Sequence, residues 1–279
     1  MKHKTFGTRT VNRAIYDYLM EDDRFRRSRQ TGRYSVPKTS VRSTEMGRPE
    51  CCPVIDATAL ENFCSGVLIA DRLVLTAGHS PADSCKVRIG ATTVVNGTEI
   101  LISGMPIRCD VSKVAKPRSE ADLVDLALLV LDEPAAVRPA LLATRGDYER
   151  AAAQVVHLCG FGYQRDNFGN LAEAGVKRSI QLPFNPDDTP QDPAFSRRHE
   201  FVAGGRTGKG VIFDAEEGDS GAPAYLETKG GGIIVIGIDS RNAAGHKSIY
   251  TRVDAHLDWI YSVAEKYGIT IPGASSTAP

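Results

Sequence analysis

The sequence predicts an all-β protein with one helix near its C-terminal end, and three observations support this. From about Cys51 onward, short runs rich in β-branched residues follow one another, separated by Gly, Pro, Asp and Asn. Asn96-Gly97 stands between two such runs as a two-residue hairpin turn. The segment 255–267 carries apolar residues at helical spacing, namely Leu257, Ile260, Tyr261 and Ala264.

The runs with strand character are taken in chain order. They are Phe63–Leu75, Lys86–Ile89, Thr92–Ile102, Leu123–Leu131, Gln154–Leu158, Lys177–Leu182, Val211–Phe213, Ile233–Ile238 and Ser248–Val253. Their composition is typical of strands that pack on a half-buried surface. The Gly-rich run 203–210 lacks the first glycine and the final Ser/Thr of a phosphate loop, so we expect a mobile loop there.

The first 50 residues differ from the rest in charge. The whole chain has 279 residues and a formal net charge of zero, but residues 1–50 hold 12 Lys/Arg against 6 Asp/Glu. The front end is therefore net +6 and the remainder net −6. A short helix is expected over Val11–Met20, followed by the basic stretch Arg24–Arg33. Two interpretations stay open, a solvated extension and a pro-segment or partner-binding arm.

Composition argues against several classes of protein. Zero net charge argues against nucleic-acid binding by bulk electrostatics. No run approaches the ~18 consecutive apolar residues of a membrane span. The charged start Met1–Lys4 is not followed by the apolar run of a secretory signal, so none is expected and the compartment is left undecided.

Six cysteines, at positions 51, 52, 64, 85, 109 and 159, show no spacing typical of a zinc site, and no metal is expected. Cys64 and Cys85 flank one strand-to-loop connection, so a disulfide between them is predicted. The adjacent Cys51 and Cys52 could equally be buried apolar fillers.

Three short motifs contain the residue types that nucleophilic acyl transfer requires. His79 follows the apolar run 73–77, Asp125 opens the apolar run 126–131, and Ser220 lies in Gly218-Asp219-Ser220-Gly221. A serine hydroxyl becomes nucleophilic when an imidazole takes its proton, and a buried carboxylate fixes the tautomer of that imidazole. Asp122 competes with Asp125 for the third role.

The glycines around Ser220 have a role of their own. The backbone N–H groups of Gly218 and Ser220 can donate to a developing oxyanion, and a side chain at position 218 would obstruct that approach. No serine of this chain stands in a G-x-S-x-G elbow, which disfavours an α/β-hydrolase.

These motifs, in the order His, Asp, Ser, resemble those of the trypsin/chymotrypsin family of serine endopeptidases, including its bacterial branches. The likeness covers about residues 64–260, with 46 residues from His79 to Asp125 and 95 from Asp125 to Ser220. Further stretches that resemble the family are Phe63–Ile69, Cys159-Gly160-Phe161-Gly162, Tyr250–Val253 and Trp259-Ile260.

The resemblance implies two antiparallel six-stranded Greek-key barrels and a C-terminal helix. The expected domains are a basic N-terminal extension or pro-segment over 1–47, a first barrel over 48–145, and a second barrel with helix and short tail over 146–279. The resemblance also implies that His79 is the general base, Asp125 its orienting partner and Ser220 the nucleophile, with no cofactor.

The resemblance further implies a specificity pocket. Asp214, six residues before Ser220, would lie at its base and pair with a substrate Arg or Lys. The opposite wall is expected at Asp239-Ser240-Arg241-Asn242, where Ser240 matches the serine beside the triad. Asp239 would add a second carboxylate, and Glu216 and Glu217 add negative charge nearby. The alternative is that Asp214 pairs with an internal cation such as Arg241 and closes the pocket.

Several positions depart from the family pattern. Ser80 and Glu216 stand where paired cysteines are common, and Asn242 replaces a glycine, which could narrow the site. No Arg/Lys-Ile-Val-Gly-Gly activation sequence is present, although Asp219 is the residue that would bind a new amino terminus. The chain then uses another cation, is cut at a basic point (Arg33, Lys38 or Arg42), or stays a zymogen.

Taken together, the sequence predicts a serine endopeptidase that cleaves proteins or peptides through an acyl-enzyme, after Arg or Lys, and that is made as a zymogen. The alternative is a catalytically silent binding module on a protease fold. The physiological substrate and the oligomeric state are left open.

Overall fold

The computed structural model describes part of the chain, and the statements below concern that part. The residues described are 48, 50–56, 63–80, 85–89, 92–95, 98–101, 107–115, 124–135, 137–150, 155–162, 164–165, 171–172, 177–184, 187–206, 212–213, 215–227, 233–244 and 247–273. The predicted N-terminal extension over 1–47, with its helix at Val11–Met20, lies outside these residues.

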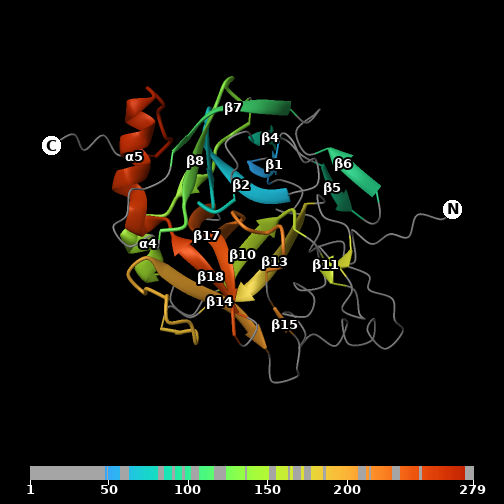
Figure 1. Ribbon diagram of the computed structural model, residues 1–279, viewed down its shortest axis with the longest axis vertical. Helices are drawn as coiled ribbons and strands as arrows, with labels where there is room; N and C mark the ends of the chain where they lie inside the picture. Colours follow the sequence, from blue (N-terminus) through green and yellow to red (C-terminus); the bar gives the residue numbers. More distant parts are fainter. Residues whose placement is uncertain are drawn as a thin grey trace.

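The first half of the chain forms a closed antiparallel barrel. Its strands run in the spatial order β1-β2-β3-β8-β7-β4, and β4 pairs back with β1. Their bounds are β1 Cys51–Asp56, β2 Phe63–Ala70, β3 Leu73–Thr76, β4 Cys85–Ile89, β7 Ile107–Ala115 and β8 Ala127–Leu131. A hairpin of β5 (Thr92–Val95) and β6 (Thr98–Leu101) projects beside this barrel (Figure 1).

The second half forms another curled antiparallel sheet. Its main strands follow the order β13-β10-β16-β17-β18-β14, and a bridge between Phe184 and Ala203 joins the two ends of this order. The bounds are β10 Val155–Gly160, β13 Arg178–Pro183, β14 Glu200–Arg206, β16 Pro223–Glu227, β17 Ile233–Ala243 and β18 Lys247–Arg252. Shorter elements are β9 Leu141–Leu142, α4 Arg145–Arg150, β11 Gln164–Arg165, β12 Leu171–Ala172, β15 Ile212–Phe213 and η2 Asp254–His256.

Both barrels have the same topology. When the six main strands of each are counted in chain order, each barrel places them in the spatial order first, second, third, sixth, fifth, fourth. The long return connection after the third strand is the feature of a Greek key. The predicted pair of six-stranded Greek-key barrels with a C-terminal helix is confirmed, while the domain boundary at 145/146 stays a prediction.

Burial on both faces explains why several runs are apolar without alternation. In β3, Leu73 and Leu75 belong to one apolar cluster, and Val74 belongs to another inside the first barrel. Strand β8 alternates between the same two clusters. Successive side chains of a strand point to opposite faces, so a strand between two cores has no polar face.

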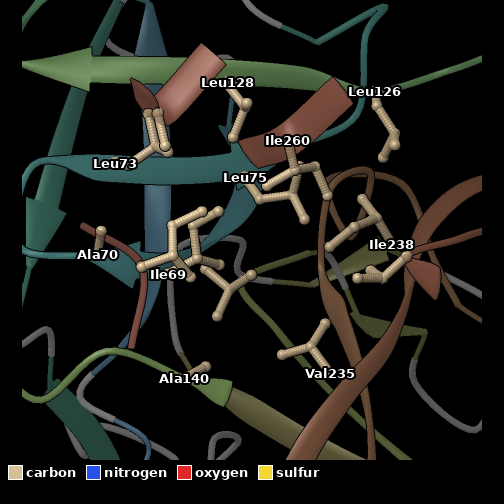
Figure 2. Packing of buried hydrophobic residues seen from close by; sticks show 14 of the residues in the cluster. Ile69, Ala70, Leu73, Leu75, Leu126, Leu128, Ala140, Val235, Ile238 and Ile260 are labelled. Carbon is tan, nitrogen blue, oxygen red and sulfur yellow. The ribbon is translucent and has the colours of Figure 1, made fainter. Parts of the chain in front are cut away.

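The cluster outside the first barrel joins both barrels and the C-terminal helix α5 (Leu257–Lys266). It combines Ile69 and Leu75 of the first barrel with Val235 and Ile238 of β17 and Ile260 of α5 (Figure 2). Each of these five side chains is fully buried. Burying such a side chain contributes about 1.5–3 kcal/mol. Helix α5 therefore packs against the first barrel. The shared apolar cluster fixes the position of the two barrels relative to one another.

Most predicted elements are confirmed, with two corrections. Val95 pairs with Thr98, as a two-residue turn requires, and α5 lies within the predicted helix. The run Phe63–Leu75 forms two strands rather than one, because a turn at Asp71-Arg72 separates β2 from β3. Part of the expected mobile loop is strand, since β14 reaches Arg206. The sequence does not predict strands β1, β7, β14 and β16, nor the two-residue strands β9, β11 and β12.

The predicted disulfide between Cys64 and Cys85 is wrong, and the described cysteines include no disulfide. Strand β1 explains why, because Cys64 pairs with Val54 from one side of β1 while Cys85 pairs with Asp56 from the other. Two strand spacings of about 4.8 Å separate them, whereas the Cα atoms of a disulfide are about 4.4–6.8 Å apart. Cys51 and Cys52 are buried in apolar clusters, as the filler interpretation expects.

This arrangement makes a prediction for thiol chemistry. Iodoacetamide in denaturant without reductant should alkylate Cys51, Cys52, Cys64, Cys85 and Cys159, each of which is a thiol in the structure. In the native protein Cys64 should react first because it is the most exposed of these, although burial raises the pKa of its thiol. Peptide mass spectrometry measures both results. Alkylation of Cys64 or Cys85 only after reduction would contradict the structure.

Candidate active site

His79 lies on the tight connection that leaves β3. The preceding glycine, Gly78, has no room for a side chain, because a Cβ there would lie 2.9 Å from Leu126 O and 3.1 Å from Asp125 Oδ1. The absence of that side chain lets the chain approach Asp125 closely. The Thr-Ala-Gly-His sequence thus places the imidazole beside the residue that opens β8.

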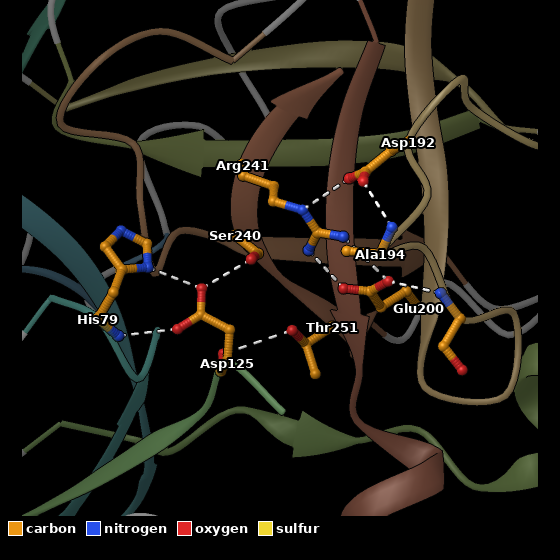
Figure 3. Close-up of polar contacts among 9 residues, drawn as sticks. His79, Asp125, Asp192, Ala194, Glu200, Ser240, Arg241 and Thr251 are labelled. Carbon is orange, nitrogen blue, oxygen red and sulfur yellow. Dashed lines mark hydrogen bonds and ion pairs between the residues drawn. The ribbon is translucent and has the colours of Figure 1, made fainter. Parts of the chain in front are cut away.

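His79 and Asp125 form a two-point contact. His79 N–H donates to Asp125 Oδ1 at 2.8 Å, and His79 Nδ1 lies 2.7 Å from Asp125 Oδ2 (Figure 3). A carboxylate only accepts, so Nδ1 carries the proton and Nε2 presents a lone pair. The imidazole side chain is 50% exposed and the carboxylate 20%. This geometry fixes the tautomer of the histidine and leaves its side chain half exposed.

Ser240, from β17 of the second barrel, completes the surroundings of the carboxylate. Its Oγ donates to Asp125 Oδ2 at 2.6 Å (Figure 3). Burial alone would raise the pKa of Asp125, but the hydrogen bonds from His79 and Ser240 hold that pKa below its usual value. Asp125 is therefore an anion at neutral pH and is held by donors from both barrels.

Ser220 lies on a loop of the second barrel, residues 215–222, that packs onto the end of β3. Ser220 C=O accepts the N–H of Ser65 at 2.8 Å. A Cβ on Gly221 would lie 2.2 Å from Thr76 Oγ1 and 3.0 Å from Ala77 N. Gly221 also has a φ of +85°, a backbone conformation that favours glycine. The turn after Ser220 is thus pressed against the segment that leads to His79.

Asp219 is held by main-chain donors on its own loop and on the segment after β10. Its Oδ1 accepts Gly162 N–H at 2.9 Å, and its Oδ2 accepts Glu216 N–H at 3.1 Å. A Cβ on Gly160 or Gly162 would lie within 2.6 Å of Asp219. The glycines of Cys159-Gly160-Phe161-Gly162 therefore make room for this carboxylate.

Gly218, a predicted oxyanion donor, is buried and has a φ of +90°. It stands two residues before Ser220, and its C=O accepts the hydroxyl of Ser65 at 3.1 Å. A residue with a Cβ would be strained at this φ, so the conformation requires glycine.

The predicted pocket residues differ in burial, and one of them lies outside the described residues. Asp239 is 3% exposed, and its N–H and C=O pair with Ala222 and Gly221. It thus adjoins the turn after Ser220. Glu217 is exposed. Asp214, expected at the base of the pocket, lies outside the described residues.

Arg241 forms ion pairs with two carboxylates of the segment 187–200. Its Nη atoms donate to both oxygens of Glu200, which is 1% exposed, and its Nε donates to Asp192 at 2.9 Å (Figure 3). Burial alone would lower the pKa of Arg241, but Glu200 and Asp192 raise it. The alternative in which Arg241 pairs with Asp214 stays a prediction, because Asp214 lies outside the described residues.

Sequence reasoning missed two functional candidates. Ser65 stands within the Phe63–Ile69 motif, but nothing in that motif signals that its hydroxyl reaches Gly218 and Phe161. Glu200 is a lone acid that opens a strand, a position that usually indicates a solvated edge, yet it is buried against Arg241.

The described residues contain no group of three or more metal-ligating side chains. Among the helices of that same part of the chain, none is long and apolar enough to cross a membrane.

Comparisons with known proteins agree with the fold described above. A family model described as trypsin matches residues 42–260. "Glucanase inhibitor protein 1" of Phytophthora sojae is 29% identical over 219 residues, which cover 74% of this chain and 80% of that protein. "Trypsin" of Saccharopolyspora erythraea is 28% identical over 71% of this chain and 85% of that protein. "Trypsin Tyr p 3.0101" of Tyrophagus putrescentiae is 24% identical over 77% of each. These relatives do not single out the bacterial branch that the resemblance included.

The bond from Ser240 to Asp125 makes a prediction for stability. Ser240→Ala should lower the free energy of unfolding at pH 7 by about 1–3 kcal/mol, because it removes a hydrogen bond to a partly buried carboxylate. The donor lowers the folded pKa of Asp125, so its contribution is present above the unfolded pKa of about 3.9 and is lost as pH falls through the folded pKa.

Urea unfolding at pH 7 and at pH 3 measures this difference. Ser262→Ala is the control, since that hydroxyl binds the C=O of Trp259 on an exposed helix face and its effect should not change with pH. An equal loss at both pH values in Ser240→Ala would rule out the coupling to Asp125.

Proposed function

This chain belongs to the trypsin family, and from that membership we propose that it is a serine endopeptidase with Ser220 as nucleophile. One observation carries the proposal. His79 is held by Asp125 in the tautomer that leaves Nε2 basic, and the Ser220 turn packs against the segment that leads to His79. A base with a fixed tautomer, on the segment against which the serine turn packs, supports acyl transfer by these residues.

The proposed reaction has two stages. In the first, Ser220 Oγ attacks the carbonyl carbon of the scissile peptide bond while His79 Nε2 takes its proton, and Asp125 stabilises the imidazolium. The N–H groups of Gly218 and Ser220 donate to the oxyanion, and the leaving amine receives the proton from His79. In the second stage water, activated by His79, hydrolyses the ester on Ser220 and restores the hydroxyl.

We further propose cleavage after Arg or Lys. Asp214 is the expected partner of the substrate cation, and the buried Asp239 supports the proposal because it adds a carboxylate beside the Ser220 turn. Asn242 Nδ2 donates to Ala215 C=O at 3.3 Å, so it spans the wall strand and the 215–222 loop. We expect that contact to narrow the entrance of the proposed specificity pocket. A glycine at position 242 has no side chain and would leave the entrance wider.

A zymogen form is also proposed. Arg33, Lys38 and Arg42, within the basic extension, are the expected cleavage points. Arg33 and Lys38 precede the region that matches the family, residues 42–260, and Arg42 is its first residue. An enzyme specific for Arg or Lys could cut these points itself.

A second candidate function is the binding of a partner protein without catalysis. The observation that favours it is the similarity to relatives named "Glucanase inhibitor protein 1" and "Glucanase inhibitor protein 3", the latter of Phytophthora infestans at 28% identity. A protease fold can be kept for its binding surface alone. The presence of histidine, aspartate and serine at positions 79, 125 and 220 favours the enzyme.

Covalent labelling discriminates the two candidates. A fluorophosphonate probe should label the wild-type protein at Ser220, because the reagent reacts with a serine whose proton a base removes. Ser220→Ala should not label, and His79→Ala should label at least about 10²-fold more slowly, within the range of general-base contributions. Peptide mass spectrometry identifies the labelled residue.

The labelling is measured before and after limited trypsin digestion. Reaction only after digestion supports the zymogen form, and equal reaction in both excludes it. Failure under both conditions, with the protein folded by circular dichroism, would support the binding function instead.

Fluorogenic peptides test the specificity. Turnover of peptides ending in Arg or Lys should exceed turnover of peptides ending in Phe, because a buried carboxylate pairs with the cation. Asp214→Ser should lower kcat/KM for the Arg peptide at least about tenfold, as losing a charged partner costs about 1.5–3 kcal/mol. Glu133→Ser is the control at an exposed acid that follows β8 in the first barrel and is not among the predicted pocket residues. Comparable turnover of Phe and Arg peptides would reject Arg/Lys specificity.

A further inference from the structure

Ser65, on β2 of the first barrel, connects three segments at the candidate active site. It is fully buried, and its N–H donates to Ser220 C=O at 2.8 Å. Its C=O accepts the hydroxyl of Thr76 at 2.7 Å. Its own hydroxyl lies 3.1 Å from Gly218 C=O and 3.0 Å from Phe161 N. The Ser65 side chain thus contacts Phe161, which follows β10 of the second barrel, and Gly218, the residue expected to donate to the oxyanion.

The two hydroxyl bonds have a fixed direction. Phe161 N–H can only donate and Gly218 C=O can only accept, so the hydroxyl accepts the first and donates its single proton to the second. Both main-chain groups are in buried surroundings, where an unsatisfied partner is costly. The Ser65 hydroxyl therefore has one orientation that satisfies both groups. In that orientation it restrains the direction of the Gly218 carbonyl.

Gly218 is the residue that needs such a restraint. Its φ of +90° is open to glycine, and glycine has the largest conformational freedom of any residue. Its carbonyl is held by Ser65, and the next residue, Asp219, is held through its carboxylate by Gly162 N–H. Phe161 and Gly162 are neighbours, so one short segment after β10 binds Asp219 directly and acts on Gly218 through the hydroxyl of Ser65.

We propose that Ser65 is a positioning residue for the oxyanion hole, holding Gly218 so that its N–H faces the oxyanion formed on the substrate. The inference rests on the proposed endopeptidase function and names a residue outside the triad. Ser65 does not touch the reacting atoms; it acts through Gly218. Ser65→Ala keeps the rest of the side chain and removes the hydroxyl that binds Gly218 and Phe161.

The test compares Ser65→Ala with the wild type in fluorophosphonate labelling and in turnover of whichever peptide substrate is cleaved. The phosphoryl oxygen of the probe occupies the position of the oxyanion, so its reaction depends on Gly218. Removing an oxyanion donor outright costs about 10²–10³-fold in kcat. Misdirecting one should cost at least about tenfold in kcat and in the maximal labelling rate constant, with KM changed less than about twofold.

The rate constant separates positioning from stability. A variant that merely folds less well labels to a lower amplitude at an unchanged rate constant, whereas a misplaced Gly218 lowers the rate constant itself. Ser179→Ala is the matched control, because Ser179 is also a buried strand serine and its Oγ has no hydrogen-bond partner among the described residues. It should label at the wild-type rate.

Ser65→Cys serves as a second variant, which keeps the shape and a weaker donor. Its rate constant should lie between those of the wild type and Ser65→Ala, and it carries the test if the alanine variant does not fold. A folded Ser65→Ala or Ser65→Cys that labels at the wild-type rate constant overturns the inference alone. A wild-type protein that does not label at all, before or after limited digestion, overturns the proposed function and this inference with it.

Discussion

The main chain at Gly221 lies so close to the first barrel that no side chain fits between them. A Cβ there would lie 2.1 Å from Ser65 C=O and 2.2 Å from Thr76 Oγ1. This contact joins the 215–222 loop of the second barrel to the ends of β2 and β3 in the first. The position of Ser220 relative to His79 depends on it, because the two residues lie on different barrels and share no secondary-structure element.

The apolar cluster between the barrels gives this junction its rigidity. It includes Leu75 and Leu128 of the first barrel, Val235 and Ile238 of the second, and Ile260 of α5 (Figure 2). Close-packed interiors transmit displacement rather than absorb it. A shift of one barrel would therefore move Asp125 away from Ser240, which approaches it from the other barrel at 2.6 Å. The packing of the apolar cluster therefore also maintains the distance between Ser240 and Asp125.

Charge at the site is arranged in two separate groups. Asp125 is held by His79 and Ser240, while Arg241, the residue next to Ser240, is turned to Glu200 and Asp192 (Figure 3). The register of β17 against β18 shifts between Asp239 and Arg241, and such a bulge changes the direction of the side chains within it, so Ser240 and Arg241 bind different carboxylates. The guanidinium of Arg241 is thereby neutralised by Asp192 and Glu200 and does not compete with His79 for Asp125.

The sequence by itself determined the all-β class with a terminal helix, because apolar runs bounded by turns carry this information locally. The two-barrel architecture and the three candidate catalytic residues followed from the resemblance of short motifs to a known family, among them Thr-Ala-Gly-His, whose glycine has a geometric cause. Tertiary structure alone decided the contacts between distant segments. It placed Cys64 and Cys85 on opposite sides of β1, paired Arg241 with Glu200, and brought the hydroxyl of Ser65 to Gly218, 153 residues away. Such contacts depend on barrel closure and strand register, which no window of neighbouring residues specifies.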